Sequence, residues 1–160
     1  MDLNILIPDG ESTWAINVIQ CLGDLSRLRL HVLSRTQKTE AKYSKFISSF
    51  SFYKAIDNDA QWVRVLNSEI KNKNIHLVLP IAEKEIQFII NHKDQLSSDV
   101  NIMTLPSLKS FQTAILKNRL FEFLIANNIP TPASITQKKT IDLYDQLNDI
   151  AYPVLLKPLN

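Results

Sequence analysis

The fold is decided by the stretch Ile75-His76-Leu77-Val78-Leu79, which ends at Pro80. A short apolar run that is closed by proline is typical of a strand buried on both faces of a parallel sheet. His76 within it is expected to be an ordinary strand histidine. A helical pattern lies on each side of the run, over 58–73 and 82–92. Strands that alternate with helices predict βαβ units and a parallel sheet.

The helix before this strand has two clearly different sides. Asp57 or Asn58 can cap its first turn. The spacing of its apolar residues predicts a buried side that consists of Trp62, Val63, Leu66 and Ile70. We expect its exposed side to carry Glu69, Lys71 and Lys73. In the helix after the strand, one apolar stripe is formed by Ala82, Ile86, Ile89 and Ile90.

Four further strands are predicted at 4–8, 28–33, 50–54 and 102–104. Between the first two, Ser12 can cap a helix with one apolar face formed by Trp14, Val18 and Leu22. Right-handed crossovers then give a five-stranded doubly wound α/β domain over residues 1–105. Its fully buried positions should include Leu6, Val78, Leu79 and Ile102. Trp14 and Trp62 are expected to anchor the core.

After residue 105 the pattern of alternating strands and helices ends. Residues 106–127 are predicted to be helical in two pieces, and Asn127-Asn128 ends the second piece. Pro130 and Pro132 then force an extended segment. A strand at 134–135, a helix at 140–150 and a strand at 151–158 follow. We therefore divide the chain into a domain at 1–105, linking helices at 106–130 and the start of a second domain at 131–160.

Composition excludes several classes of function. The net charge is +2 and the basic residues are scattered, which does not favour a nucleic-acid partner. With only Gly10 and Gly23, the chain cannot form a glycine-rich phosphate loop. Cys21 is the single cysteine and is expected to be a small buried side chain, and no Cys/His spacing predicts zinc. No signal peptide and no membrane span are expected, so the default location is cytoplasmic.

Polar residues follow two of the predicted strands. Asp9-Gly10-Glu11 comes after the first strand, at the carboxyl edge where α/β proteins bind ligands. Gly10 would permit close approach of a ligand, and the next helix offers free N–H groups. An ordinary strand–helix turn explains this segment equally well. Glu83, after the fourth strand, is either a substrate ligand or a first-turn acid that complements the helix dipole.

The last 45 residues carry a resemblance to a known family. Lys117 opens a helix, Ile129-Pro130-Thr131-Pro132 follows it, and Tyr152-Pro153-Val154-Leu155-Leu156-Lys157-Pro158 comes after one more helix. This order resembles the beginning of the ATP-grasp fold. The first domain, with Leu77-Val78-Leu79-Pro80 and Glu83, is similar to the Rossmann-like preATP-grasp domain of carbamoyl-phosphate-synthase-like and related carboxylate–amine ligases.

The resemblance implies a chemistry and a set of residues. The intact parent would use ATP and Mg²⁺ to activate a carboxylate as an acyl phosphate, which an amine then attacks. Lys117 and Lys157 would contact ATP phosphates, and Asp9, Gly10, Glu11 and Glu83 would lie at the substrate. The family's glycine-rich loop and metal ligands would follow residue 160, so a fragment ending there should be inactive and bind no cofactor. Whether the protein forms a homodimer stays open.

Plainer interpretations exist for each lysine and for the whole chain. Lys117 would otherwise be an exposed helical residue, and Lys157 a solvated strand end. The alternative function is a non-enzymatic, flavodoxin-like binding or regulatory module. A phospho-receiver version of that module would require an aspartate after the third strand, and the segment at 50–54 has none.

Overall fold

The computed structural model describes residues 2–54, 58–134, 153, 155 and 157. The chain divides into two compact units, Met1–Pro106 and Ser107–Asn160. Among the described helices, none combines the length and the apolar character that a bilayer crossing requires.

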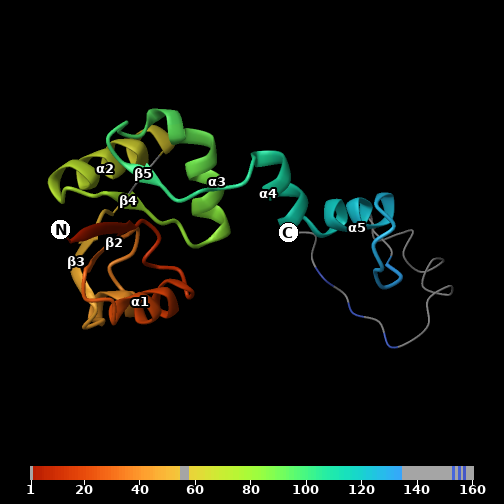
Figure 1. The fold of residues 1–160 in the computed structure, drawn as a ribbon, viewed down its shortest axis with the longest axis horizontal. Coiled ribbons are helices and arrows are strands. Elements are labelled where there is room, and N and C mark those ends of the chain that lie inside the picture. Colours follow the sequence, from red (N-terminus) through yellow and green to blue (C-terminus); the bar gives the residue numbers. More distant parts are fainter. Residues whose placement is uncertain (1, 55–57, 135–152, 154, 156, 158–160) are drawn as a thin grey trace. The chain divides into compact units, whose positions relative to one another are not determined.

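The first unit is built around a five-stranded sheet with the order β3-β2-β1-β4-β5 (Figure 1). Its strands are β1 (Leu3–Ile7), β2 (Leu28–Ser34), β3 (Ile47–Phe52), β4 (Leu77–Val78) and β5 (Asn101–Ile102). Every neighbouring pair is parallel. The predicted five-stranded parallel α/β sheet is therefore confirmed.

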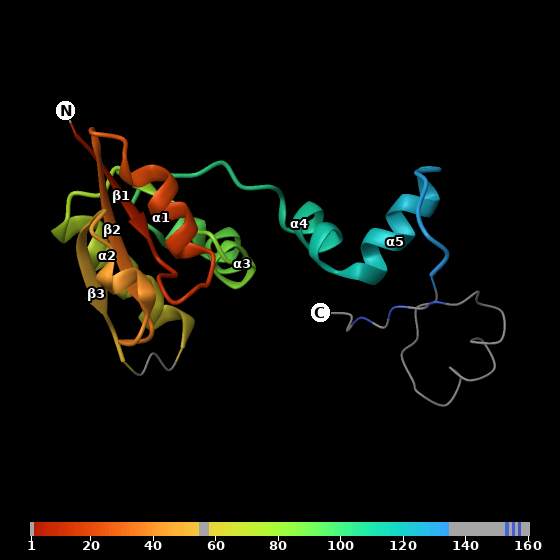
Figure 2. The same cartoon turned by 90° about the horizontal axis from the view of Figure 1, so that it is seen from below.

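Helices cover both faces of this sheet, with α1 on one side and α2 and α3 on the other (Figures 1 and 2). They are α1 (Ala15–Gly23), α2 (Asp59–Asn72) and α3 (Glu83–His92), with the short 3-10 helices η1 (Glu40–Tyr43) and η2 (Lys93–Gln95). Successive residues of β1 enter two different cores: Leu6 packs on the side of α2, and Ile5 and Ile7 pack on the side of α1. The alternation of side chains along a strand produces this division.

Two of the four positions predicted to be fully buried are only partly so. Leu6 and Val78 are completely inaccessible, whereas Leu79 and Ile102 are partly exposed. The reason is that the paired part of β4 and β5 is short. Strands β4 and β5 contain two paired residues each, so Leu79 follows the end of β4 and Ile102 is the last residue of an edge strand.

The predicted burial of Trp14 and Cys21 is wrong. Trp14 is 65% exposed because α1 begins one residue later, at Ala15. The buried face of α1 then consists of Ala15 and Ile19 rather than the stripe that starts at Trp14. This shift leaves Cys21 on the exposed side.

The predicted exposure of Glu69 is also wrong. Its carboxylate is buried and accepts hydrogen bonds from Ser51 Oγ (2.9 Å) and Tyr53 Oη (3.1 Å). Lys73 Nζ lies 2.6 Å from Glu69 Oε2. Ser51 of β3, Tyr53 just after β3 and Lys73 at the end of α2 therefore replace the water that this carboxylate would otherwise need.

The described part of the second unit includes the helices α4 (Leu108–Ile115) and α5 (Lys117–Ala126), which confirms the predicted helix in two pieces. Ser107 caps α4 by accepting from Ser110 N. Asn128, just beyond α5, has φ 54°, a conformation that ends a helix. The elements predicted at 134–135, 140–150 and 151–158 lie outside the described residues, apart from isolated positions.

Candidate functional site

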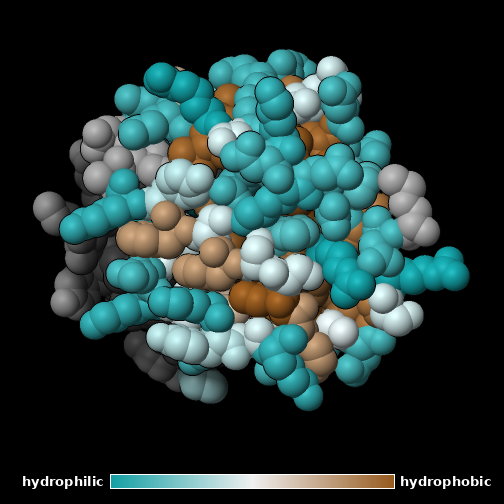
Figure 3. All heavy atoms as spheres, turned by 90° about the vertical axis from the view of Figure 1, so that its left-hand side faces the viewer, coloured by the Kyte–Doolittle hydropathy of each residue, from teal (hydrophilic) through white to brown (hydrophobic). Residues whose placement is uncertain are grey.

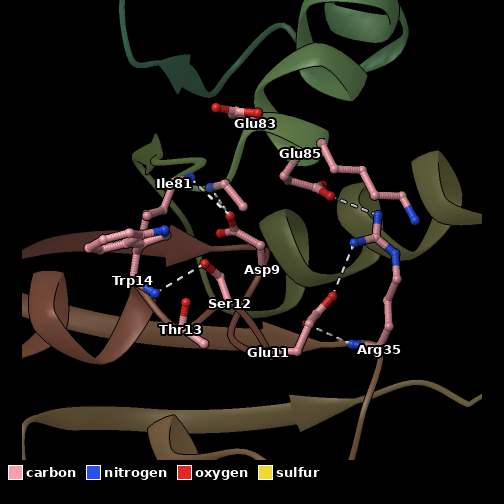
Figure 4. A pocket seen from close by; sticks show the side chains of 11 residues that line it. Asp9, Glu11, Ser12, Thr13, Trp14, Arg35, Ile81, Glu83 and Glu85 are labelled. Atoms are coloured by element: carbon pink, nitrogen blue, oxygen red, sulfur yellow. Dashed lines mark hydrogen bonds and ion pairs between the residues drawn. The ribbon is translucent and has the colours of Figure 1, made fainter. Parts of the chain in front are cut away.

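An open cleft of about 840 Å³ lies in the first unit, at the carboxyl ends of the central strands (Figure 4). Asp9 follows β1, Arg35 follows β2, and Ile81 follows β4. This is the edge at which open α/β sheets bind their ligands. The lining is formed by Asp9, Glu11, Ser12, Thr13, Trp14, Arg35, Ile81, Ala82, Glu83, Lys84 and Glu85.

Asp9 is the most unusual side chain of the cleft because its carboxyl group is only half satisfied. The residue is 3% exposed. Its Oδ2 accepts hydrogen bonds from the backbone N–H groups of Ile81 (3.0 Å) and Ala82, just before α3 begins. Its Oδ1 is buried and has no hydrogen-bond partner among the described residues. An unpaired buried oxygen of this kind is costly and requires an explanation, such as an unseen ligand.

The Arg35 side chain contacts three other side chains, those of Glu85, Glu11 and Trp62. Its Nη2 lies 2.7 Å from Glu85 Oε2, and its Nη1 lies 3.3 Å from Glu11 Oε1. The guanidinium carbon lies 3.8 Å from the centre of the Trp62 ring. Glu85 is 1% exposed and also accepts a hydrogen bond of 2.8 Å from Trp62 Nε1. The charged wall of the cleft is thereby fixed to the buried core of α2 and α3.

Burial raises the pKa of both inner carboxyl groups. For Asp9, loss of solvent outweighs the backbone N–H groups of Ala82 and Ile81, which lower the pKa. For Glu85, loss of solvent outweighs the opposing effect of Arg35 and the bond from Trp62, and Asp9 raises the pKa further. Groups of this kind are common at functional sites.

The charges of the lining favour a cationic ligand. Four carboxyl groups face two basic side chains, Arg35 and Lys84. Arg35 is already shared between Glu11 and Glu85, so Asp9 and Glu83 are the acids that it does not neutralise. An ammonium group could donate hydrogen bonds to such carboxylates.

The pKa of Asp9 leads to a testable effect on stability. Because this pKa is raised above its ordinary value of 3.8, folding favours the protonated acid. Relative to Asp9→Asn, the wild type should be most stable below pH ~3.8 and lose stability as the pH rises through the raised pKa. We expect Asp9→Asn to become the more stable protein near pH ~7. Urea unfolding of both proteins from pH ~3 to pH ~8 measures this, and parallel curves would contradict it.

The structure brings three of the candidate residues, Asp9, Glu11 and Glu83, into this one cleft. Gly10, between Asp9 and Glu11, is not among the residues that line the cleft. A Cβ atom at Gly10 would lie 2.3 Å from Val32 Cγ1, so the close approach that this glycine permits is to β2. This packing explains why a glycine is required at position 10, a reason that the sequence did not reveal.

The two candidate lysines belong to the second unit, whereas the residues that line the cleft all belong to the first. Lys117 is the first residue of α5 and is exposed, and Lys157 is an exposed, isolated described position. Their assignment to ATP phosphates stays a prediction.

Arg35 and Glu85 are the site residues that the sequence did not identify. A signal for Arg35 existed, since it directly follows the second strand just as Asp9 follows the first. Glu85 gave no such signal, because an acid in the first turn of a helix is ordinarily exposed. In the described part of the chain, no cluster of three His, Cys, Asp or Glu side chains could hold a metal ion.

Comparison with known proteins finds no protein-family profile and no curated protein that matches this chain. Among solved structures, the L-amino acid ligase from Bacillus licheniformis is similar, with 15% identity and a TM-score of 0.57. The match covers 99% of this chain and 37% of that protein. At this level of identity the similarity is one of fold: the chain has the α/β fold of part of an L-amino acid ligase and spans little more than a third of its length.

Proposed function

We propose that this chain is part of an ATP-dependent ligase that joins a carboxylate to an amine, and that its first unit binds the ammonium group of a substrate. One observation carries the substrate half of the proposal: the half-satisfied carboxyl group of Asp9 in the cleft at the carboxyl edge, whose lining also includes the acid Glu83. The fold shared with part of an L-amino acid ligase supports the ligase half. Amino acids and amines carry an ammonium group at neutral pH, which matches the charge of this cleft.

The contribution of the first unit would be orientation. Bound ATP would supply the phosphoryl group that activates the carboxylate. Asp9 and Glu83 would hold the substrate's ammonium group, while Arg35 keeps the neighbouring acids neutralised and in place. Fixing one end of a substrate positions its reactive end, which is a large part of what a ligase must provide.

The nucleotide does not suit the same cleft. A triphosphate would lie against four carboxyl groups, and Arg35 is already shared by two of them. Phosphate recognition favours arginine, lysine and free N–H groups instead. The proposed phosphate contacts, Lys117 and Lys157, both belong to the second unit.

The 160-residue chain should therefore bind ATP more weakly than ~1 mM, an affinity that already requires about 4 kcal/mol. Two exposed lysine contacts are screened by water and must also offset the cost of ordering the ligand. Isothermal titration with ATP and Mg²⁺ measures the affinity. In the intact ligase, Lys157→Ala should abolish most ATP binding and Lys117→Ala should weaken it. Micromolar binding by this chain would contradict the proposed nucleotide site.

The cleft should bind a small cation and reject the matching anion. We expect L-alanine amide to shift the backbone signals of residues 9–14 and 81–85 in ¹H–¹⁵N spectra, and N-acetyl-alanine to leave them unchanged. Asp9→Asn should weaken the binding about tenfold, since a hydrogen bond to a charged group contributes ~1.5–3 kcal/mol. Asp99→Asn, an exposed acid of the same unit, is the control. Equal binding of both compounds, or an equal loss in both variants, would refute ammonium recognition.

A further inference from the structure

The edge strand β3 and the residues on either side of it have an unusual composition, rich in aromatic and basic residues. Residues 41–54, Ala-Lys-Tyr-Ser-Lys-Phe-Ile-Ser-Ser-Phe-Ser-Phe-Tyr-Lys, contain three lysines and no acid. Five of these residues are aromatic: Tyr43, Phe46, Phe50, Phe52 and Tyr53. None of the 14 residues lines the cleft, so a role for this segment would be independent of the proposed ligase site.

The backbone of β3 is paired on one side only among the described residues. Its single strand neighbour there is β2. Tyr53 N donates to Ser34 O of β2. Since successive residues of a strand direct their backbone groups to opposite sides, Ser49 and Ser51 also face β2, whereas Phe50 and Phe52 direct N–H and C=O outward. An edge of this kind is a template for another strand.

The side chains beside this edge form a surface that is apolar and basic at once. Tyr43 is 80% exposed, and Phe46, Phe50 and Phe52 are partly exposed. Lys42 Nζ lies 5.7 Å from the Tyr43 ring and 6.0 Å from the Phe50 ring, and Lys45 Nζ lies 5.0 Å from the Phe46 ring. Figure 3 shows the side of the molecule on which β3 lies, with apolar and weakly polar residues gathered between hydrophilic ones.

The distribution of charge around β3 indicates which kind of partner could pair with its free edge. The three lysines flank the strand, and Ile47–Phe52 itself is uncharged. A second copy that paired antiparallel about Phe50 would bring Lys45 of each chain within one residue of the position opposite Lys54 of the other, which is unfavourable. Nucleic-acid bases would need an open sheet face on which to stack, but helices cover both faces here. An extended segment with acidic residues would pair with the outward backbone groups of β3 and also complement the charge of the three lysines.

We propose that the outer edge of β3 binds an extended, acidic peptide segment of another protein, which adds a sixth strand to the sheet. The outward N–H and C=O groups of Phe50 and Phe52 supply the main-chain hydrogen bonds. Lys42, Lys45 and Lys54 pair with carboxylates of the segment, and the exposed Tyr43 ring and the outer parts of the partly buried phenylalanine rings pack against its apolar side chains. Such strand addition derives affinity from the backbone and selectivity from the side chains.

The test uses the ¹⁵N-labelled 160-residue chain and a capped heptapeptide of alternating glutamate and valine. We expect the peptide to slow hydrogen exchange at the Phe50 and Phe52 amides and to leave Ser49 and Ser51, already in the ladder, unchanged. The same peptide methylated on alternate backbone nitrogens should not bind. The triple variant Lys42→Glu, Lys45→Glu, Lys54→Glu should weaken binding about tenfold, since each lysine would form an ion pair that is at least partly open to solvent.

A matched triple variant with Lys71→Glu, Lys93→Glu and Lys109→Glu changes the net charge equally at exposed positions elsewhere. It should bind the heptapeptide within about twofold of the wild type. The proposal is overturned if this control loses as much affinity, if the methylated peptide binds equally well, or if an oligothymidylate competes for the same amides with higher affinity. None of these results bears on ammonium or ATP binding.

Discussion

Replacing Trp62 by alanine is expected to lower the free energy of unfolding by about 3–5 kcal/mol. The side chain is 1% exposed and belongs to the same buried cluster as Leu66 and Ile89. Its loss leaves a cavity, removes the ring on which Arg35 stacks, and deprives Glu85 of a donor. Small domains are stabilised by only about 5–15 kcal/mol, so the variant should be close to unfolding. Urea unfolding followed by circular dichroism measures the difference.

The other tryptophan supplies the control. Trp14 is 65% exposed at the rim of the cleft, and Trp14→Ala should change the free energy of unfolding by no more than about 0.5 kcal/mol. Comparable losses in the two variants would mean that the core is not organised around Trp62 as described here.

The fold could be predicted because its central elements have strong local patterns. The i, i+4 spacing of α2 identified Trp62, Leu66 and Ile70 as buried, and all three are. The apolar run that contains Leu77 and Val78 identified a strand of the parallel sheet. Local spacing is sufficient where one face of a helix or both faces of a strand enter a core.

The errors arose where burial depends on a precise boundary or on a distant segment. The helix predicted to begin directly after Ser12 begins at Ala15 instead, so Trp14 lies outside it, and its buried face is formed by Ala15 and Ile19, away from the exposed Cys21. Glu69 is buried only because Ser51 and Tyr53, more than a dozen residues earlier in the chain, provide its hydrogen bonds. Periodicity contains no information on such partners.

The same distinction applies to the cleft. The rule that ligands bind at the carboxyl ends of parallel strands identified Asp9, Glu11 and Glu83 as candidates, and all three line one cleft. The link between Arg35 and Glu85 spans 50 residues and requires α3 to lie beside the end of β2. A sequence pattern could place Arg35 at the correct edge but could not supply its partner.

Replacing Glu85 by leucine should lower the free energy of unfolding by about 3 kcal/mol. Leucine suits the buried position, but it leaves Trp62 Nε1 without its acceptor and removes the closer of the two carboxylates that hold Arg35. Removal of one partner of a fully buried ion pair costs about 3–5 kcal/mol. We expect the lower end of that range because the Arg35 side chain is 25% exposed and keeps Glu11.

Two further variants separate the hydrogen bond from the charge. Glu83→Leu, at an exposed position two residues earlier in the same helix, should change the free energy of unfolding by about 0.5 kcal/mol or less. Glu85→Gln keeps an oxygen for Trp62 Nε1 but loses the charge, so its cost should lie between those of the two leucine variants. Thermal and urea unfolding at one fixed pH measure all three. If Glu85→Leu is as stable as the wild type, the raised pKa of Glu85 reflects a cost of burying this acid that its pairing with Arg35 does not offset, and the Arg35–Glu85 pair does not hold α3 against the end of β2.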